Sequence, residues 1–286
     1  MNHRELWKEI FGDTDKYIDY YFKEKAKKSK VYSRYEGDEL AGMAFFTPCD
    51  MMYRGGHCVC PYIVGVATRE ENRGRGHMRR NIEQGLDEFQ RAGARLAFLS
   101  PSDEQIYRPL GFSPVYYRRK IEVYGHKKKW YEAVPFSQMS GESIRDLEKF
   151  SSGLLAASDL DLYMNHSTEY LGQLHQEMKA LDGEVIALWD GGKICGMAAY
   201  TWEEGAYEVT EVICDPENGS KVVESLCACL DEAESKKITI LDGYFLGDVS
   251  GEGIRILQSE KPYIMAKALN MDEEVTGLRV YINDIT

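Results

Sequence analysis

The segment from Val64 to Met78 constrains the fold of this 286-residue chain most strongly, because it predicts a strand, a glycine-rich loop and a helix in direct succession. Val64-Gly65-Val66-Ala67-Thr68 is rich in β-branched residues, and Arg73-Gly74-Arg75-Gly76 leads into the helix that begins near His77 and Met78. Glycines let backbone N–H groups approach a ligand closely, and the first turn of a helix presents donors without helical partners. The segment therefore predicts a binding site for an anion such as a pyrophosphate.

Composition narrows the class of protein. Hydrophobic residues make up 43% and charged residues 29% of the chain, and the formal net charge of −12 disfavours nucleic acid as a partner and would attract a cationic small molecule such as a polyamine or aminosugar. No apolar run approaches the roughly 20 residues of a membrane helix, and no signal core follows the N-terminus. We therefore expect a cytoplasmic protein without a membrane partner.

The seven cysteines are scattered along the chain. The C-x-C pairs Cys58/Cys60 and Cys227/Cys229 lack the spacing and histidine partners of zinc sites. We therefore expect reduced thiols and no metal.

The order of the predicted elements indicates an α/β fold with a mixed sheet. Apolar spacing predicts helices at 6–11, 17–22 and 78–89, and strands at 31–35, 40–47, 58–68, 96–100 and 115–123, with a hairpin turn at 36–39. The succession of strand, crossover helix and strand around the loop is a βαβ unit, which favours parallel pairing of the two strands.

An internal repeat predicts a second domain. Asp190-Gly191-Gly192-Lys193-Ile194-Cys195-Gly196-Met197-Ala198 resembles Glu36-Gly37-Asp38-Glu39-Leu40-Ala41-Gly42-Met43-Ala44, and strands at 207–214 and 238–241 with a helix at 222–235 follow in the same order. Pro216-Glu217-Asn218-Gly219-Ser220 stands where the first copy has its arginines, and a carboxylate there would repel a pyrophosphate. We predict a first domain over 1–125, a connection over 126–140 and a degenerate second domain over 141–286.

The loop, together with Tyr107-Arg108-Pro109-Leu110-Gly111-Phe112 after the strand at 96–100, resembles the GCN5-related N-acetyltransferases (GNAT). Met78 departs from that pattern, which has a small residue there. The resemblance implies that acetyl-CoA binds on Val66, Ala67, Thr68, Arg73, Gly74, Arg75, Gly76, His77 and Met78, with Ser102 and Asp103 near its adenine or pantetheine end. It also implies that the Tyr107 hydroxyl protonates the departing thiolate as general acid, and that a backbone N–H of the strand stabilises the oxyanion.

Four further segments narrow the resemblance to the enhanced-intracellular-survival (Eis) type of tandem acetyltransferases. They are Trp7, Phe11-Gly12-Asp13, Ile106-Tyr107 and Lys261-Pro262-Tyr263-Ile264-Met265. In those proteins a third domain follows and its C-terminal carboxylate is the base; here only 270–286 remain after the last motif. The carboxylate of Thr286 is therefore one candidate base, with a water or a first-domain carboxylate as the alternative. Glu36, Asp38, Glu104 and His57 are candidates by residue type alone.

We expect an acetyl-CoA-dependent N-acetyltransferase that transfers acetyl directly to a primary amine of a small molecule or peptide. One alternative is a non-catalytic acyl-CoA-binding or ligand-sensing module with the same fold. A second is a transferase that uses a carrier other than CoA, against which the intact Arg-Gly-Arg-Gly loop argues. Homo-oligomers are common in this family type, and no interface is recognisable in the sequence.

Overall fold

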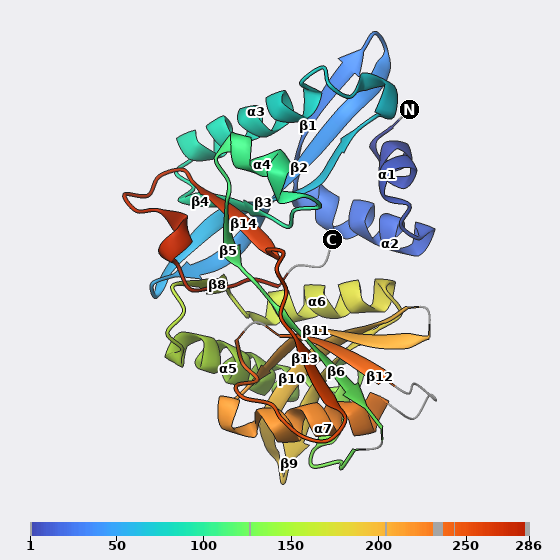
Figure 1. Ribbon diagram of the computed structural model, residues 1–286, viewed down its shortest axis with the longest axis vertical. Coiled ribbons are helices and arrows are strands. Elements are labelled where there is room, and N and C mark those ends of the chain that lie inside the picture. Colours follow the sequence, from blue (N-terminus) through green and yellow to red (C-terminus); the bar gives the residue numbers. More distant parts are fainter. Residues whose placement is uncertain (1, 126, 204, 231–236, 243, 284–286) are drawn as a thin grey trace.

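The computed structural model (Figure 1) describes residues 2–125, 127–203, 205–230, 237–242 and 244–283. The strands form two sheets with helices on their faces, which confirms the predicted mixed α/β class. The first sheet has the order β15-β8-β2-β3-β4-β14-β5, with β1 also paired to β2, and the second has the order β13-β6-β12-β11-β10-β9-β7.

The strands of the first sheet are β1 (Lys30–Glu36), β2 (Glu39–Tyr53), β3 (Gly56–Thr68), β4 (Leu96–Leu99), β5 (Ser113–Tyr116), β8 (Leu162–Met164), β14 (Ile264–Ala268) and β15 (Val280–Tyr281). Those of the second are β6 (Arg119–Tyr124), β7 (Glu132–Pro135), β9 (Glu184–Asp190), β10 (Lys193–Glu203), β11 (Ala206–Cys214), β12 (Lys237–Asp242) and β13 (Ile254–Leu257). The α-helices are α1 (His3–Phe11), α2 (Asp15–Tyr20), α3 (His77–Arg91), α4 (Glu104–Tyr107), α5 (Gly141–Ala157), α6 (Thr168–Ala180) and α7 (Gly219–Leu230).

The two sheets exchange strands. The sequence predicts one strand over 115–123, but the structure has β5 in the first sheet and β6 in the second, separated only by Tyr117 and Arg118. The chain later returns, and β14 pairs with β4 on one side and β5 on the other. Figure 1 shows these two connections running side by side between the halves of the molecule. Each sheet therefore contains strands from both sides of the predicted connection at 126–140, and the predicted division of the chain stays a prediction.

The repeat predicted in the second half corresponds to a similar order of elements. The β9–β10 hairpin, β11, the short 3₁₀ helix Pro216–Asn218, α7 and β12 follow one another as the strands and helix around the glycine loop do. The predicted helix over 222–235 begins three residues earlier, at Gly219, and its last predicted residues fall in 231–236, outside the described residues. Helices α5 and α6, which the sequence pattern did not predict, pack on the second sheet and contribute to the core that it shares with the first.

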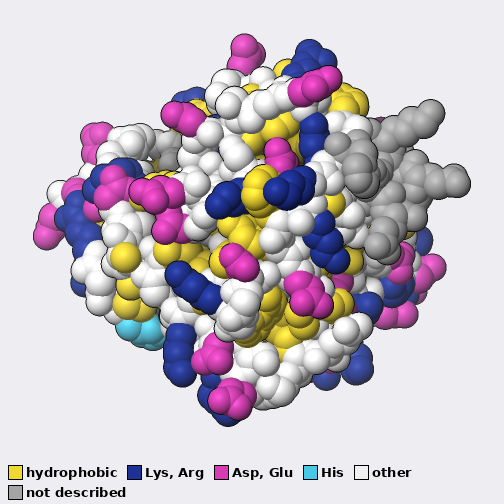
Figure 2. Space-filling model, turned by 90° about the horizontal axis from the view of Figure 1, so that it is seen from below, with side chains coloured by type: hydrophobic (Ala, Val, Ile, Leu, Met, Phe, Trp, Pro, Cys, Tyr) yellow, Lys and Arg dark blue, Asp and Glu magenta, His cyan; other side chains and the backbone are white. Residues whose placement is uncertain are grey.

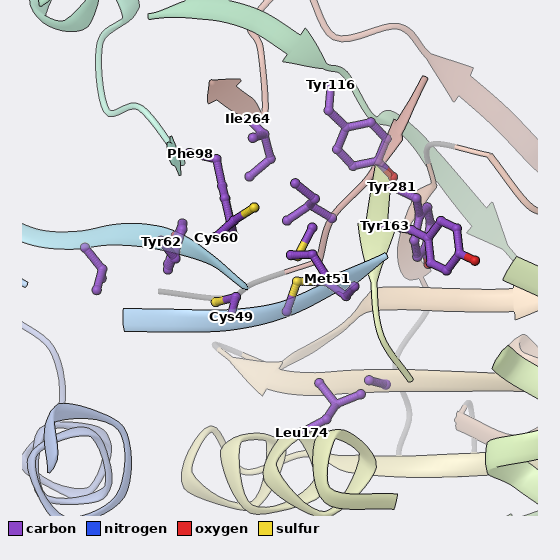
Figure 3. Close-up of a cluster of buried hydrophobic side chains, with 14 of the residues drawn as sticks. Cys49, Met51, Cys60, Tyr62, Phe98, Tyr116, Tyr163, Leu174, Ile264 and Tyr281 are labelled. Carbon is purple, nitrogen blue, oxygen red and sulfur yellow. The ribbon is translucent and has the colours of Figure 1, made fainter. Parts of the chain in front are cut away.

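One hydrophobic core joins the two sheets. It includes Leu6 and Ile18 of the N-terminal helices, Phe45 of the first sheet, Leu174 of α6 and Met197 of the second sheet. Figure 3 shows part of this core, with Cys49, Met51 and Cys60 lying close together on β2 and β3, and Leu174 approaching from α6. A smaller cluster lies under α3 on the opposite face of the first sheet, and a third cluster packs α7 on the second sheet.

Charges of both signs cover the end of the molecule that carries the second sheet. Figure 2 shows acidic and basic side chains interspersed with apolar ones on this face. Seven cysteines are reduced, of which Cys49, Cys60, Cys214 and Cys227 are buried. Within the described ranges, no helix is both long and apolar enough to cross a membrane.

Candidate functional site

The predicted glycine loop connects β3 to α3. The short 3₁₀ helix Glu70–Asn72 follows β3, and Gly74 and Gly76 adopt positive φ angles of 76° and 77°, which favour glycine. The first backbone hydrogen bond of α3 runs from Arg80 N to Gly76 O. The N–H groups of residues 77–79 are therefore the donors that the helix leaves for an anion.

Side chains shape this loop from three directions. Arg80 Nη2 donates to Arg75 O at 3.0 Å, and Arg73 Nε donates to Thr68 O at 3.4 Å. Glu36, at the end of β1, lies 3.6 Å from Arg75 Nη1 and 3.0 Å from His77 Nε2. Arg73 and Arg75 are exposed and therefore accessible to a bound phosphate, whereas His77 is buried and belongs to the framework of the loop.

A β-bulge at Gly65 redirects the strand that enters the loop. Phe45 pairs with Val64 and Met43 with Ala67, so Gly65 and Val66 together stand opposite Ala44. Val64 consequently belongs to the core between the sheets, whereas Val66 packs against the cluster under α3. Gly65 has φ +59°, and a Cβ there would lie 2.4 Å from Trp7 Cζ3, so only glycine fits.

Strands β3 and β4 separate beyond the bulge. They pair in parallel only at Tyr62↔Phe98 and Ile63↔Leu99, where β4 ends, while β3 continues to Thr68. Among the described residues, the backbone of β3 along 66–68 therefore has no strand partner on the β4 side of the sheet. This is the arrangement in which an extended ligand can pair with an exposed strand edge.

Tyr107 belongs to the cluster against which this end of β3 packs. It ends α4 and is 6% exposed, and Val66 and Met78 contact the same buried cluster. Its ring meets Phe112 edge-on at a centroid distance of 6.1 Å. Burial raises the pKa of Tyr107 to about 12, so the phenol stays protonated at neutral pH and is available as a proton donor.

The remaining predicted residues have other surroundings. Ser102 and Asp103 are exposed ahead of α4, and the Asp103 carboxylate caps that helix by accepting from Gln105 N at 2.9 Å. Thr286 lies outside the described residues; the last described residue, Asn283, lines the cavity described next. Of the candidate bases, Glu36 contacts the loop, Glu104 pairs with Arg108 at 2.8 Å, Asp38 is exposed in the hairpin turn, and His57 pairs with Asp50.

A cavity of about 540 Å³ lies on the opposite face of β3, between the first sheet and α6. Strands β2 and β3 form its floor with Thr47, Cys49, Tyr62 and Val64. Helix α6 lines it with Tyr170 and Leu174. Its rim carries Glu24, Asp50, Glu169 and Glu177 against two lysines, Lys25 and Lys28. Both lysines are paired, Lys25 with Glu177 at 2.5 Å and Lys28 with Glu169 at 2.8 Å, so the surplus charge of the cavity is negative.

The cavity residues were missed by sequence reasoning, Asp50 and Tyr170 among them. They come from segments more than 100 residues apart, and no local spacing marks them. Asp50 accepts a hydrogen bond from Asn165 Nδ2 at 2.7 Å, which ties β2 to the loop before α6. Among the residues that the structure describes, no cluster of three His, Cys, Asp or Glu side chains could hold a metal ion.

A family model described as an acetyltransferase (GNAT) domain matches residues 2–115. This match covers the glycine loop, the bulged strand and Tyr107. The first part of the chain is therefore similar to a GNAT acetyltransferase domain. None of the curated proteins matches the sequence.

Solved structures resemble nearly the whole chain. A conserved Enterococcus faecalis protein of unknown function has a TM-score of 0.72 at 15% identity, over 94% of this chain and 70% of its own. A GCN5-related N-acetyltransferase from Anabaena variabilis has a TM-score of 0.72 at 13% identity, over 93% and 69%. Eis1 from Mycobacterium abscessus has a TM-score of 0.61 at 9% identity, over 93% and 70%. At these identities the likeness shows the fold, and it extends beyond the GNAT domain to the second sheet.

Proposed function

We propose that the protein is an acetyl-CoA-dependent N-acetyltransferase that transfers acetyl directly to a primary amine of a small molecule or peptide. One observation carries the proposal: the end of β3, the first turn of α3 and Tyr107 meet at one buried cluster, and a separate negative cavity lies on the other face of β3. A donor and an acceptor can thus reach the same strand from opposite sides. This favours direct transfer through a ternary complex.

In the proposed reaction, the N–H groups at the start of α3 and the side chains of Arg73 and Arg75 bind the pyrophosphate of acetyl-CoA. The backbone of Val66, Ala67 and Thr68 pairs with the pantetheine arm, and one of its N–H groups stabilises the oxyanion. The amine in the cavity attacks the thioester carbonyl, the C–S bond breaks, and Tyr107 gives its proton to the departing thiolate. The roles of Ser102, Asp103 and Thr286 stay predictions from the resemblance.

The test is a calorimetric titration with acetyl-CoA. Wild type should bind, and Arg73→Glu combined with Arg75→Glu should weaken binding by at least tenfold, because two favourable charge contacts become repulsive. Arg91→Glu, at the exposed far end of α3, is the control for a charge reversal away from the loop and should bind like wild type. Absence of binding to wild type, or equal binding by the double variant, would refute the donor site.

Turnover is tested with a panel of primary amines. Tyr107→Phe should lower kcat by about 10²-fold or more while the affinity for acetyl-CoA changes little, since the phenol acts on the leaving group. Binding of acetyl-CoA by wild type without acetylation of any amine would favour the non-catalytic acyl-CoA-binding module instead.

A further inference from the structure

A buried polar network lies behind the cavity, where the two sheets meet. Its centre is Glu211 of β11, a carboxylate in a residue only 1% exposed. Tyr170 Oη donates to Glu211 Oε2 at 3.2 Å, and His166 Nε2 lies 3.2 Å from Glu211 Oε1. His166 is also 1% exposed, and its ring stacks on that of Tyr170 at 4.4 Å.

The network connects to the cavity through one side chain. Tyr170 lines the cavity, as do the neighbours of His166 in the chain, Asn165 and Ser167. His166 and Glu211 themselves are not among the lining residues. A proton from a molecule in the cavity can therefore reach the buried pair through the Tyr170 hydroxyl.

Packing alone does not account for this network. Burial of a carboxylate destabilises the folded state unless the carboxylate is paired or hydrogen-bonded. A neighbouring imidazole that makes a single contact offsets only part of this cost. Both ring nitrogens of His166 are buried and make no hydrogen bond within the described part of the chain, although Nε2 lies 3.2 Å from Glu211 Oε1.

The other groups around Glu211 are suited to hold it in place. Tyr281 of β15 donates to Val212 O at 3.2 Å and lies 3.5 Å from Glu211 Oε1. Burial raises the pKa of Tyr281 and of Tyr116 well above the ordinary value, so both remain neutral phenols. Arg118 donates to Thr210 O and Asn283 Oδ1, and Asp242 pairs with Arg119; these are the other charged groups nearby.

We propose that Tyr170 and Glu211 form a relay that accepts the proton of the acceptor ammonium group. The ammonium N–H proton passes to Tyr170 Oη as the phenol proton moves to Glu211 Oε2. The amine is left neutral with its lone pair free, Tyr170 is again a phenol, and Glu211 becomes a carboxylic acid beside the His166 ring. Tyr170 meets the acceptor, and Glu211 acts through it.

This inference rests on the proposed acetyltransferase function, and it supplies a base that the sequence motifs do not identify. It predicts a specific pH dependence. Without the relay, only the fraction of amine that is already neutral reacts, and an alkylamine has a pKa of about 10. The rate should then rise tenfold for each pH unit up to that value.

The experiment measures kcat/KM for an alkylamine, with saturating acetyl-CoA, from pH 6.5 to 9.5. Spermidine is the first probe, followed by the other primary amines of the panel. Tyr170→Phe keeps the ring that stacks on His166, and it should lower kcat/KM at pH 7 by about 10–100-fold, with the deficit shrinking toward pH 9.5. Glu211→Gln should give the same profile. The KM for acetyl-CoA should stay within about twofold of wild type.

Tyr163→Phe is the matched control, because it removes a buried phenol hydroxyl of β8, beside β15, and Tyr163 is not among the residues that line the cavity. Its pH profile should follow that of wild type. An unchanged profile in Tyr170→Phe, or a deficit that is equal at every pH, would overturn the relay while leaving the proposed function intact. Failure of wild type to acetylate any amine would instead overturn the proposed function, and the relay with it.

Discussion

Replacement of Gly65 by alanine tests the strand bulge that separates the two faces of the site. The new Cβ would lie 2.4 Å from Trp7 Cζ3 and 3.0 Å from Phe45 Cδ2. Trp7 is 2% exposed and packs against Tyr21 at a ring distance of 4.3 Å, so it has little room to move. The left-handed backbone costs an alanine about 1–2 kcal/mol, and overpacking costs about 1–3 kcal/mol more.

We therefore expect Gly65→Ala to lower the free energy of unfolding by about 2–5 kcal/mol. Gly55→Ala is the matched control: Gly55 has φ +76° in the hairpin between β2 and β3, and a Cβ there meets open space. It should cost only the backbone part, about 1–2 kcal/mol. Urea denaturation of both variants gives the difference, which isolates the steric overlap with Trp7.

The same pair of variants tests the donor site. Gly65→Ala should weaken acetyl-CoA binding by about tenfold, because the bulge would no longer orient Val66 and the backbone that follows it toward the ligand. Gly55→Ala should bind acetyl-CoA like wild type. Equal losses of stability in the two variants would show that the aromatic cluster yields to the extra methyl group. The argument that Gly65 is required by packing would then be refuted.

Two further results are expected. Burial raises the pKa of Tyr107 from 10 to about 12, so the unfolded state loses this proton at a lower pH than the folded state does. The free energy of unfolding should therefore fall as the pH rises from 10 toward 12. Tyr107→Phe should remove about 1.4 kcal/mol of that loss at about pH 11, measured by urea denaturation. A pH-independent difference between the two proteins would contradict this. Lys25→Met should lower stability by about 3 kcal/mol, because it removes a cation that pairs with the buried Glu177 carboxylate. Lys28→Met should lower it by at most about 1 kcal/mol, because its pair with Glu169 is exposed. Similar small losses in both variants would contradict the assigned burial.

The local signals in the sequence predicted local structure well. The β1–β2 hairpin, the strand that enters the glycine loop and the apolar face of α3 each depend on neighbours within a few residues. Thr14 caps α2 by accepting from Tyr17 N. These features are fixed by backbone chemistry that the residues themselves carry.

The strand exchange could not be predicted in the same way. Residues 115–123 have an uninterrupted strand pattern, and neither Tyr117 nor Arg118 is a turn residue that would mark a change of sheet. The place of β14 between β4 and β5 depends on pairing across more than 140 residues. The cavity has the same origin, because Asp50, Tyr170 and Asn283 meet only once both sheets are complete.

Alternation along a strand normally places residues i and i+2 on one face of the sheet. The bulge at Gly65 breaks this rule at the end of β3 that enters the glycine loop. Val64 faces the cavity and Val66 the cluster with Tyr107, so one strand serves two compartments. In the proposed reaction the amine loses its proton on the cavity side, and the thiolate gains one from Tyr107 on the other. The second sheet then supplies the proton acceptor and the first sheet supplies the proton donor, and the two groups lie in different compartments. This explains why the glycine loop identifies the donor, whereas nothing in its neighbourhood in the sequence identifies the base.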